Sequence, residues 1–344
     1  MVRLVLKGSN KTYDSLHTDN KTENNSFAIL ANTFKERTGQ DWDKKYLLSF
    51  GLVTNDGHLT NAGTLFADDC SLSQSRLYCT RWSGLEKDDA INDAEYKGNV
   101  LLLLREAMNF VKSNTKKGWE KLPDGRKNKP EYAERAVLEA MVNHFIHRDY
   151  TVMGGEVHLD IYDDRIAVTS PGGMYSGQQV QDVPLEDISS LRRNPVLADV
   201  MAQLDYMEKR GSGLKRICNE TKALEAYKED RRPVFKSSPS QFMTVIYSME
   251  YDGGLNGQLN GQLNGQLNGD DRVNDRVNDS LSDSVNSTYQ AIKANPGIQR
   301  KRISEMTGKS IPTIDRHIAL LAKSNFIEHR DSDKTGGYYP VTKK

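Results

Sequence analysis

Residues 139–150 read E-A-M-V-N-H-F-I-H-R-D-Y, and this stretch decides how the middle of the chain is interpreted. The stretch lies in a predicted helix from Glu131 to Arg148, in which Glu139, Asn143 and His147 share one face. Apolar residues flank Asn143, and a polar group on an apolar face costs free energy unless it has a partner. Two interpretations follow. Asn143 is either a buried amide satisfied by ordinary core contacts, or part of a site in which a carboxylate orients a water and the amide oxygen binds Mg²⁺.

Two glycine-rich loops follow this helix in the sequence. Pro171-Gly172-Gly173 comes directly after a predicted strand, and Lys209-Arg210-Gly211-Ser212-Gly213 directly precedes a predicted helix. The N–H groups and positive end of that helix are suited to phosphate. Glycine turns are common, so each loop alone is weak evidence, but both add weight to a site that binds metal and phosphate.

These motifs resemble those of the RecG-related, Schlafen/AlbA-type bacterial transcriptional regulators. The stretch from Glu139 to Tyr150 resembles their E-A-x-x-N-A-x-x-H-R-D-Y motif. Three further motifs follow in order over about 80 residues: Asp164-Arg165-Ile166 with Ser170-Pro171-Gly172-Gly173, then Arg193-Asn194-Pro195, then Arg210-Gly211-Ser212-Gly213-Leu214. The general resemblance covers most of residues 40–251. It implies the GHKL ATPase fold of gyrase, histidine kinases and mismatch-repair proteins.

The resemblance implies an ATP- and Mg²⁺-binding site. Asn143 would hold Mg²⁺ and Glu139 would polarise the attacking water as a general base. The remaining members of the implied nucleotide-binding set are His147, Arg148, Asp149, Gly172, Gly173, Gly211, Ser212 and Gly213. Where a GHKL site carries Asp in D-x-G-x-G, this chain has Ser170-Pro171-Gly172-Gly173, and His144 replaces a small residue. These departures favour nucleotide binding over turnover, and Arg148 is equally a candidate structural residue.

Two other patterns carry less weight. His144 and His147 with Asp149 offer a zinc alternative, but a third ligand of certain placement is lacking. Gly308-Lys309-Ser310 matches the end of a P-loop, but Ile303 stands where the first glycine belongs, which favours a simple turn between helices.

A period-four repeat divides the chain. Residues 252–269 read DGGLNGQLNGQLNGQLNG, and residues 270–285 continue with an apolar residue at every fourth place. A glycine in each unit opposes helix formation, so residues 252–285 predict a flexible linker, with a helical association strip over 270–285 as the alternative. Residues 286–344 carry 11 basic against 5 acidic residues, in a chain whose net charge is zero. This asymmetry indicates a basic module tethered to an acidic one.

The basic module predicts a winged helix-turn-helix. Helices are expected at 285–294, 299–307 and 310–323, followed by a hairpin of 326–330 with 337–341. The third helix would present Thr313, Arg316 and His317 to base edges of double-stranded DNA. The residues expected at phosphates are Arg300, Lys301, Arg302, Lys309, Lys323 and Lys334. A winged helix that binds protein is the alternative.

Overall, the sequence predicts an α+β protein in which a GHKL-like α/β sandwich over 126–251 follows a mixed α/β segment over 1–125. The middle block is expected to place helices on one face of an antiparallel sheet. Residues 3–10 resemble the closing strand of an AlbA-like domain, a remnant of which is expected within 1–20. Strands are expected at 76–82, 156–162, 165–169 and 242–249, helices at 26–38, 46–50, 100–112, 194–207 and 214–224, and a loop at 119–130.

Composition narrows the function classes. The zero net charge excludes a wholly basic surface, and the three cysteines support neither a disulfide framework nor a four-cysteine zinc site. No apolar run approaches 18 residues, so no membrane span or membrane partner is expected, and a reducing cytoplasm fits. The leading hypothesis is a DNA-binding transcriptional regulator with a divergent ATP-binding module and no helicase motor, acting as a homodimer. An ATPase of a DNA-processing or defence complex and a nucleotide-free adaptor are the alternatives.

Overall fold

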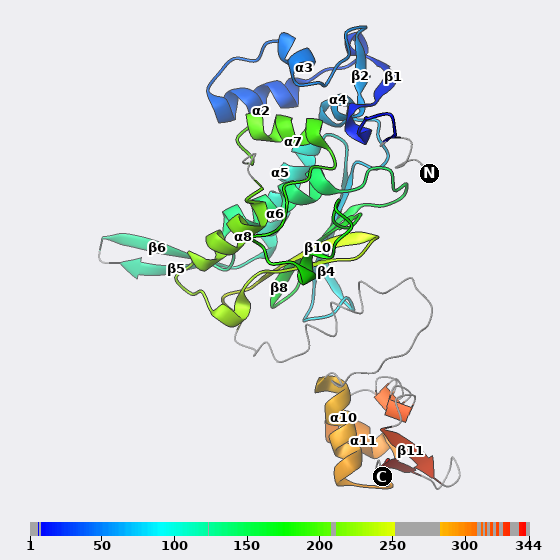
Figure 1. Cartoon of the computed structure of the whole chain (residues 1–344). Helices are drawn as coiled ribbons and strands as arrows, with labels where there is room; N and C mark the ends of the chain where they lie inside the picture. Colours follow the sequence, from blue (N-terminus) through cyan, green and yellow to red (C-terminus); the bar gives the residue numbers. More distant parts are fainter. Residues whose placement is uncertain are drawn as a thin grey trace. The chain divides into compact units, whose positions relative to one another are not determined.

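The chain forms two compact units in the computed structural model, Met1–Gly253 and Gly254–Lys344 (Figure 1). The structure describes residues 6, 8–122, 124–207, 211–251, 283–307, 311, 314, 317, 318, 321, 322, 326–330 and 337–341. The predicted linker therefore lies outside the described residues, apart from its last three positions.

A six-stranded sheet, in the order β4-β3-β7-β8-β10-β9, is the scaffold of the first unit. Its strands are β3 (Arg76–Trp82), β4 (Ala90–Lys97), β7 (Val157–Ile161), β8 (Arg165–Pro171), β9 (Val234–Ser237) and β10 (Gln241–Tyr247). The expected antiparallel sheet is corrected at one junction, because β3 pairs with β7 in parallel register, Leu77 opposite Val157. Parallel neighbours need a long crossover, and here the chain between them supplies two helices.

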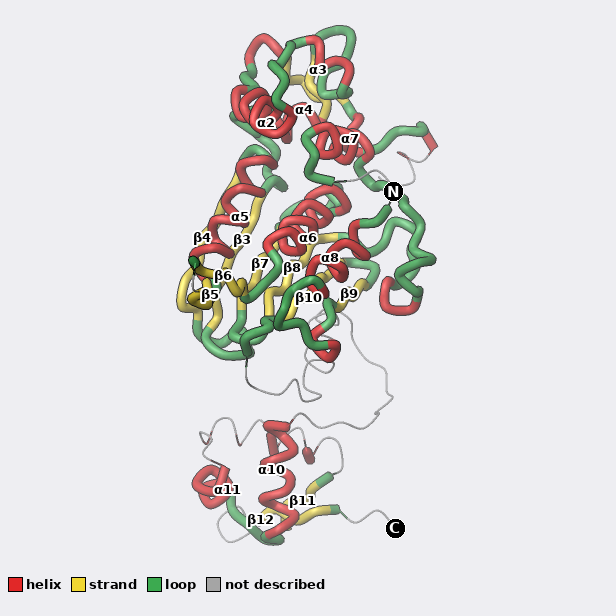
Figure 2. Tube along the Cα trace, turned by 90° about the vertical axis from the view of Figure 1, so that its left-hand side faces the viewer, coloured by secondary structure: helices red, strands yellow, loops and turns green. Residues whose placement is uncertain are grey.

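Three helices cover one face of this sheet: α5 (Val100–Asn114), α6 (Glu134–His147) and α8 (Gly213–Lys222) (Figure 2). The α6 side chains Val137, Ala140 and Met141 are fully buried between the sheet and the neighbouring helices. Helix α5 begins where the Asn99 side chain accepts hydrogen bonds from the N–H groups of Leu101 and Leu102. The predicted layering of helices on one face is therefore confirmed.

The first unit also contains smaller elements. They are η1 (Tyr13–Ser15), β1 (His17–Lys21), η2 (Thr22–Asn24), α2 (Ala28–Thr38), α3 (Lys45–Ser49), β2 (His58–Thr60), α4 (Asn61–Phe66), η3 (Val180–Asp182), α7 (Pro195–Gln203) and η4 (Glu229–Arg231). The Asp14 carboxylate accepts a hydrogen bond of 3.0 Å from the N–H of Leu197 in α7. The sheet takes β3 and β4 from before residue 125 and its other strands from after it, so the segments 1–125 and 126–251 form one compact unit.

Two local expectations need correction. Residues 119–130 were expected to be a loop, but β5 (Lys117–Leu122) and β6 (Gly125–Pro130) pair as a two-stranded hairpin. Its polar sequence lacks the apolar alternation by which a strand is predicted, because neither strand joins the main sheet. The strand expected at 3–10 is also wrong where it is described, because Leu6 and Gly8 are helical and Ser9 and Asn10 lie in a turn.

The second unit has its own small core. It contains α10 (Asp283–Ala294), α11 (Arg300–Thr307) and the antiparallel pair β11 (Ile327–Arg330) and β12 (Gly337–Pro340). Between α11 and β11, all the described residues from 311 to 322 are helical. Its buried side chains are Ala291, Ile292, Ile298, Ile303, Ile314, Ile318, Leu321 and Ile327. The boundaries of α10 and α11 lie within two residues of those predicted, whereas most of the predicted third helix lies outside the described residues.

Candidate functional site

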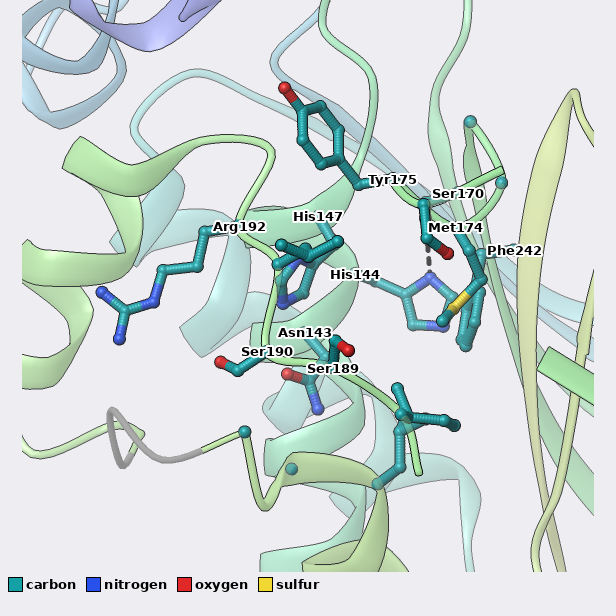
Figure 3. Close-up of a pocket in the computed structure, with 18 of the residues that line it drawn as sticks. Asn143, His144, His147, Ser170, Met174, Tyr175, Ser189, Ser190, Arg192 and Phe242 are labelled. Carbon is teal, nitrogen blue, oxygen red and sulfur yellow. Dashed lines mark hydrogen bonds between the residues drawn. The ribbon is translucent and has the colours of Figure 1, made fainter. Parts of the chain in front are cut away.

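A cleft opens between α6, the loop that follows β8, the 188–192 segment and the start of α8 (Figure 3). It encloses about 960 Å³ of empty space, part of it open to solvent. Glu139, Asn143 and His147 all line it, one helical turn apart along α6. The face predicted from the sequence is therefore the floor of a real cleft.

One end of the cleft is polar and lies at the beginning of α8. A Cβ atom on Gly213, the first residue of α8, would lie 2.7 Å from Nδ2 of Asn143 and 3.0 Å from Oε1 of Glu139. Glycine therefore lets the helix N-terminus approach these two side chains closely. The Nδ2 atom of Asn143 is buried and has no hydrogen-bond partner among the described residues. Such a donor is costly to leave unpaired, and the open cleft beside it is where a ligand would satisfy it.

Glu139 also faces a cation at this end. Its Oε2 atom lies 3.6 Å from Nη1 of Arg216, which belongs to the first turn of α8, and both side chains are largely buried. The carboxylate therefore carries its charge beside a guanidinium group. This arrangement keeps Glu139 in place at the cleft wall and offsets part of the cost of burying it.

The opposite end of the cleft is less polar and contains His144. Its Nδ1 lies 2.8 Å from Oγ of Ser170 on β8, and its Nε2 lies 3.0 Å from Oγ1 of Thr244 on β10. Burial, together with the neighbouring His147, lowers the pKa of His144 to about 3, so the ring is neutral at pH 7. Phe242 packs edge-on against the ring, and Met174 lies beside it in the cleft (Figure 3).

The neutral ring of His144 connects two hydroxyl groups. A neutral imidazole has one donor nitrogen and one acceptor nitrogen, so one hydroxyl donates to it and the other accepts from it. Ser170 lines the cleft, and it can therefore offer a ligand either a proton or a lone pair. A carboxylate at this position would only accept.

His147 lies between the two ends. Burial lowers its pKa to about 4, and the charges of Arg193 and Arg192 act in the same direction. The ring lines the cleft as a neutral group at pH 7, next to Arg192 on the facing segment (Figure 3).

The Gly172–Gly173 loop is held from behind and faces the cleft. Gly172 has φ +88°, and a Cβ atom there would collide with Arg193 and Asp149. Its N–H donates to the Ser240 carbonyl at 2.6 Å, and Nη2 of Arg193 donates to the Gly173 carbonyl at 2.6 Å. The loop is therefore a fixed wall whose glycines are required by close packing.

Arg148, Asp149 and Ser212 do not line the cleft. Arg148 is buried, donates to the Gln74 carbonyl at 2.6 Å and packs its guanidinium over the Tyr150 ring. Asp149 accepts hydrogen bonds from the backbone and hydroxyl of Thr151 and lies 3.6 Å from Arg193. Both residues position the loop after α6, so the structural alternative for Arg148 describes its place in the fold. Ser212 is the residue before α8, between Gly211 and Gly213, which do line the cleft.

Part of the cleft could not be predicted from the sequence. The 188–192 segment and Tyr175 form its outer side, and a Cβ atom on Gly211 would come within 2.6 Å of Ser190. The 188–192 segment and Tyr175 belong to a stretch of sequence without hydrophobic periodicity. Only the tertiary structure brings them close to α6. No group of three or more His, Cys, Asp and Glu residues is placed to hold a metal within the described parts of the chain, so the zinc alternative gains no support.

Only some of the predicted DNA-binding residues of the second unit are among the described residues. Arg300, Lys301 and Arg302 at the start of α11 are exposed, and Arg302 pairs with Glu305 at 2.9 Å. His317 has Nδ1 2.8 Å from the hydroxyl of buried Thr288, so this ring nitrogen faces α10. The other predicted contacts lie outside the described residues: Lys309, Thr313, Arg316, Lys323 and Lys334.

Comparisons with known proteins agree with this architecture. The family model described as "Putative ATP-dependent DNA helicase recG C-terminal" matches residues 154–246. Those residues are similar to an ATPase-like domain of the RecG C-terminal family. The match includes both glycine loops and the strands β7 to β10, while α6 lies just before it.

A solved structure shares the fold. The DIP2311 protein from Corynebacterium diphtheriae matches 97% of this chain at 18% identity with a TM-score of 0.58, and this chain spans 65% of that protein's length. No curated protein matches the chain. No helix among the described residues is long and apolar enough to span a membrane.

Proposed function

We propose that the chain is a DNA-binding regulator whose first unit binds a magnesium nucleotide in the cleft between α6 and α8. The observation that carries the proposal is the polar end of the cleft, where an unpaired amide of Asn143 and a helix N-terminus meet beside two glycine loops. The similarity of residues 154–246 to an ATPase-like domain supports the same conclusion.

The residues present fit such a ligand. The Asn143 side chain would bind Mg²⁺ through its oxygen, a hard ligand, once the amide is turned to suit the ion. The N-terminus of α8, with Gly211, Ser212 and Gly213 before and within its first turn, would bind phosphates through backbone N–H groups. A bound magnesium ion supplies positive charge that neutralises the phosphate oxygens. His144 and Ser170, next to Phe242 and Met174, are suited to the base.

Arg148 and Asp149 have a positioning role in this proposal. Their contacts hold the loop after α6 and, through Arg193, the Gly172–Gly173 wall. We therefore expect their loss to weaken nucleotide binding by disturbing the wall, and not by removing a ligand contact.

The proposed DNA contact lies in the second unit. Its residues 286–344 have six more basic than acidic residues, and Arg300 and Lys301 are exposed at the start of α11. Exposed cations of this kind bind phosphates of double-stranded DNA without reading its sequence. A homodimer that joins two such units through the linkers would gain affinity by avidity, and nucleotide binding would regulate how these units engage DNA. A winged helix and a cytoplasmic location belong to this proposal.

The decisive test is a thermal-shift titration of the full chain with Mg-ATP. At 100 times the Kd, ligand binding adds about 2.7 kcal/mol, which corresponds to a rise in Tm of about 5–10 °C for a unit of this size. We expect Asn143→Ala to abolish most of this rise and Asn109→Ala, an exposed asparagine on α5, to keep it. No shift for the wild type, or an equal shift for Asn143→Ala, would contradict the proposed site and favour an adaptor that binds no nucleotide.

An ATPase is the second candidate because Glu139 lies in the cleft one helical turn from Asn143. A carboxylate in this place can orient a water for attack on a phosphate. Steady-state phosphate release separates the candidates. Release that Glu139→Gln abolishes, while the Mg-ATP thermal shift persists, would establish hydrolysis, whereas binding without release supports the regulator.

A further inference from the structure

The hairpin of β5 and β6, residues 117–130, is the most isolated part of the first unit. It projects from the body of that unit (Figure 1), and its strands pair only with each other. We call residues 116–130 the arm. A two-stranded ribbon has little core of its own, and six backbone pairs from Lys117–Pro130 to Leu122–Gly125 define its register.

The charge of the arm is opposite to that of its unit. The arm contains six Lys and Arg residues against two acidic residues, whereas the rest of residues 1–251 has 28 basic and 34 acidic residues. Lys116 and Lys121 are exposed to solvent. A basic protrusion on an acidic body concentrates positive potential at one place and attracts a polyanion there.

A large aromatic side chain lies on this basic surface. Trp119 is 59% exposed. Such exposure is unusual for an indole, because burying the ring would remove a large apolar area from water. On a strand it projects from the ribbon on the same side as Lys121, two residues further on. An exposed indole beside ammonium groups is a combination that stacks a base and binds its phosphate.

The base of the arm is hollow next to Trp119. This hollow is lined by apolar side chains, Met108, Val111 and Tyr132, with Lys112 and Lys116 also in its wall. The acidic groups there are already paired: Glu131 accepts from Ser248 and from the N–H of Lys116, and Glu134 lies 2.5 Å from Lys112. A flat apolar group with a phosphate attached would therefore find apolar side chains for its faces and a lysine for its phosphate.

We propose that the arm binds single-stranded nucleic acid, with Trp119 stacking on an unpaired base and Lys116 and Lys121 binding adjacent phosphates. A single strand is favoured because bases in a duplex are already stacked on each other and cannot place a face against the indole. The site shares no residue with the nucleotide cleft.

Fluorescence anisotropy of the full chain with labelled dT20 and with a 20-base-pair duplex tests the proposal. Stacking of one base is worth about 1–3 kcal/mol, so we expect Trp119→Ala to weaken dT20 binding by about 5- to 150-fold. Lys121→Gln should reduce the slope of log K against log salt by about 0.7 for the single strand. Neither substitution should change duplex binding, which is expected to depend on Arg300 and Lys301.

Matched variants keep the result interpretable. Lys44→Gln alters an exposed lysine near α3, and Leu48→Ala alters an exposed apolar residue of α3, and both should bind dT20 like the wild type. Far-UV circular dichroism checks that Trp119→Ala remains folded. Binding of dT20 that is equal in the wild type and Trp119→Ala would overturn the proposal. The proposal would also be overturned if Trp119→Ala weakened binding of polyglutamate, an anion without bases, as much as it weakened binding of dT20. The arm would then be a site for acidic protein segments.

Discussion

At the residue scale, the role of each side chain in the site depends on where it is buried. Asn143 and Glu139 could be placed on one helix face from their spacing, and both line the cleft. From the sequence, His144 was identified as a departure from a family pattern and as part of a zinc alternative. The structure places its ring between Ser170 and Thr244, on strands whose residues lie 26 and 100 positions away, and burial lowers its pKa so that it is neutral at pH 7. Arg148 and Asp149 share the motif but serve packing, because the helix ends before them and the chain turns away from the cleft.

His144 should make stability depend on pH. Its folded pKa of about 3 lies below the ordinary value of 6.5, so between these values the unfolded chain binds more protons and stability falls as pH falls. The loss approaches about 1.4 kcal/mol per pH unit below pH 6 for one such group. We expect His144→Gln to reduce this slope in urea unfolding between pH 7 and 4. His17→Gln, at an exposed position, is the control, and an unchanged slope in His144→Gln would show that the buried ring does not carry the effect.

At the element scale, helix termini were predicted less well than helix centres. The end of α6 was expected at Arg148, but the helix stops at His147, where Asn194 donates from its amide to the carbonyls of Ile146 and Arg148. The start of α5 at Val100 was predicted correctly, and it is set by Asn99. Its amide also donates to the carbonyls of Phe66 and Ala67, which lie 33 and 32 residues away. Distant caps of this kind leave no periodic signal in the sequence.

Replacing Asn99 therefore tests an element boundary. Asn99→Ala removes the cap of α5 and leaves two buried carbonyl groups without this donor, so we expect a loss of about 2–4 kcal/mol in the free energy of unfolding. Urea denaturation measures it. Asn109→Ala, in the exposed face of the same helix, should change stability by less than about 0.5 kcal/mol. A similar, small loss in both variants would mean that α5 does not depend on its cap.

At the scale of the whole molecule, the two compact units divide at Gly253 and Gly254, near the beginning of the repeat at 252–285. The division at residue 125 has no counterpart in the sheet. Strand β3 pairs with β7, and this parallel pairing joins the early segment to the later one. A change in composition along the chain can be read from the sequence. That two segments contribute strands to one sheet cannot, because it depends on contacts between distant residues.

Two independent cores predict two unfolding transitions. Ile303 is fully buried in the second unit, and Ile303→Ala should cost that unit about 2–5 kcal/mol. In differential scanning calorimetry we expect only one transition to move down in temperature, with duplex DNA binding lost above it. Met306→Ala, at an exposed position of α11, should move neither transition. A shift of both transitions by Ile303→Ala would show that the units unfold together.

The sequence alone determined the α+β class, the helical face of Glu139, Asn143 and His147, the two glycine loops and the separation of the basic unit. Each of these depends on periodicity, composition or spacing within a few tens of residues. Only the tertiary structure decided which motif residues face the cleft, which ones brace it, and that a lysine-rich stretch forms a projecting ribbon. These features depend on contacts between segments far apart in the chain, and such contacts are set by packing and burial of the folded chain as a whole.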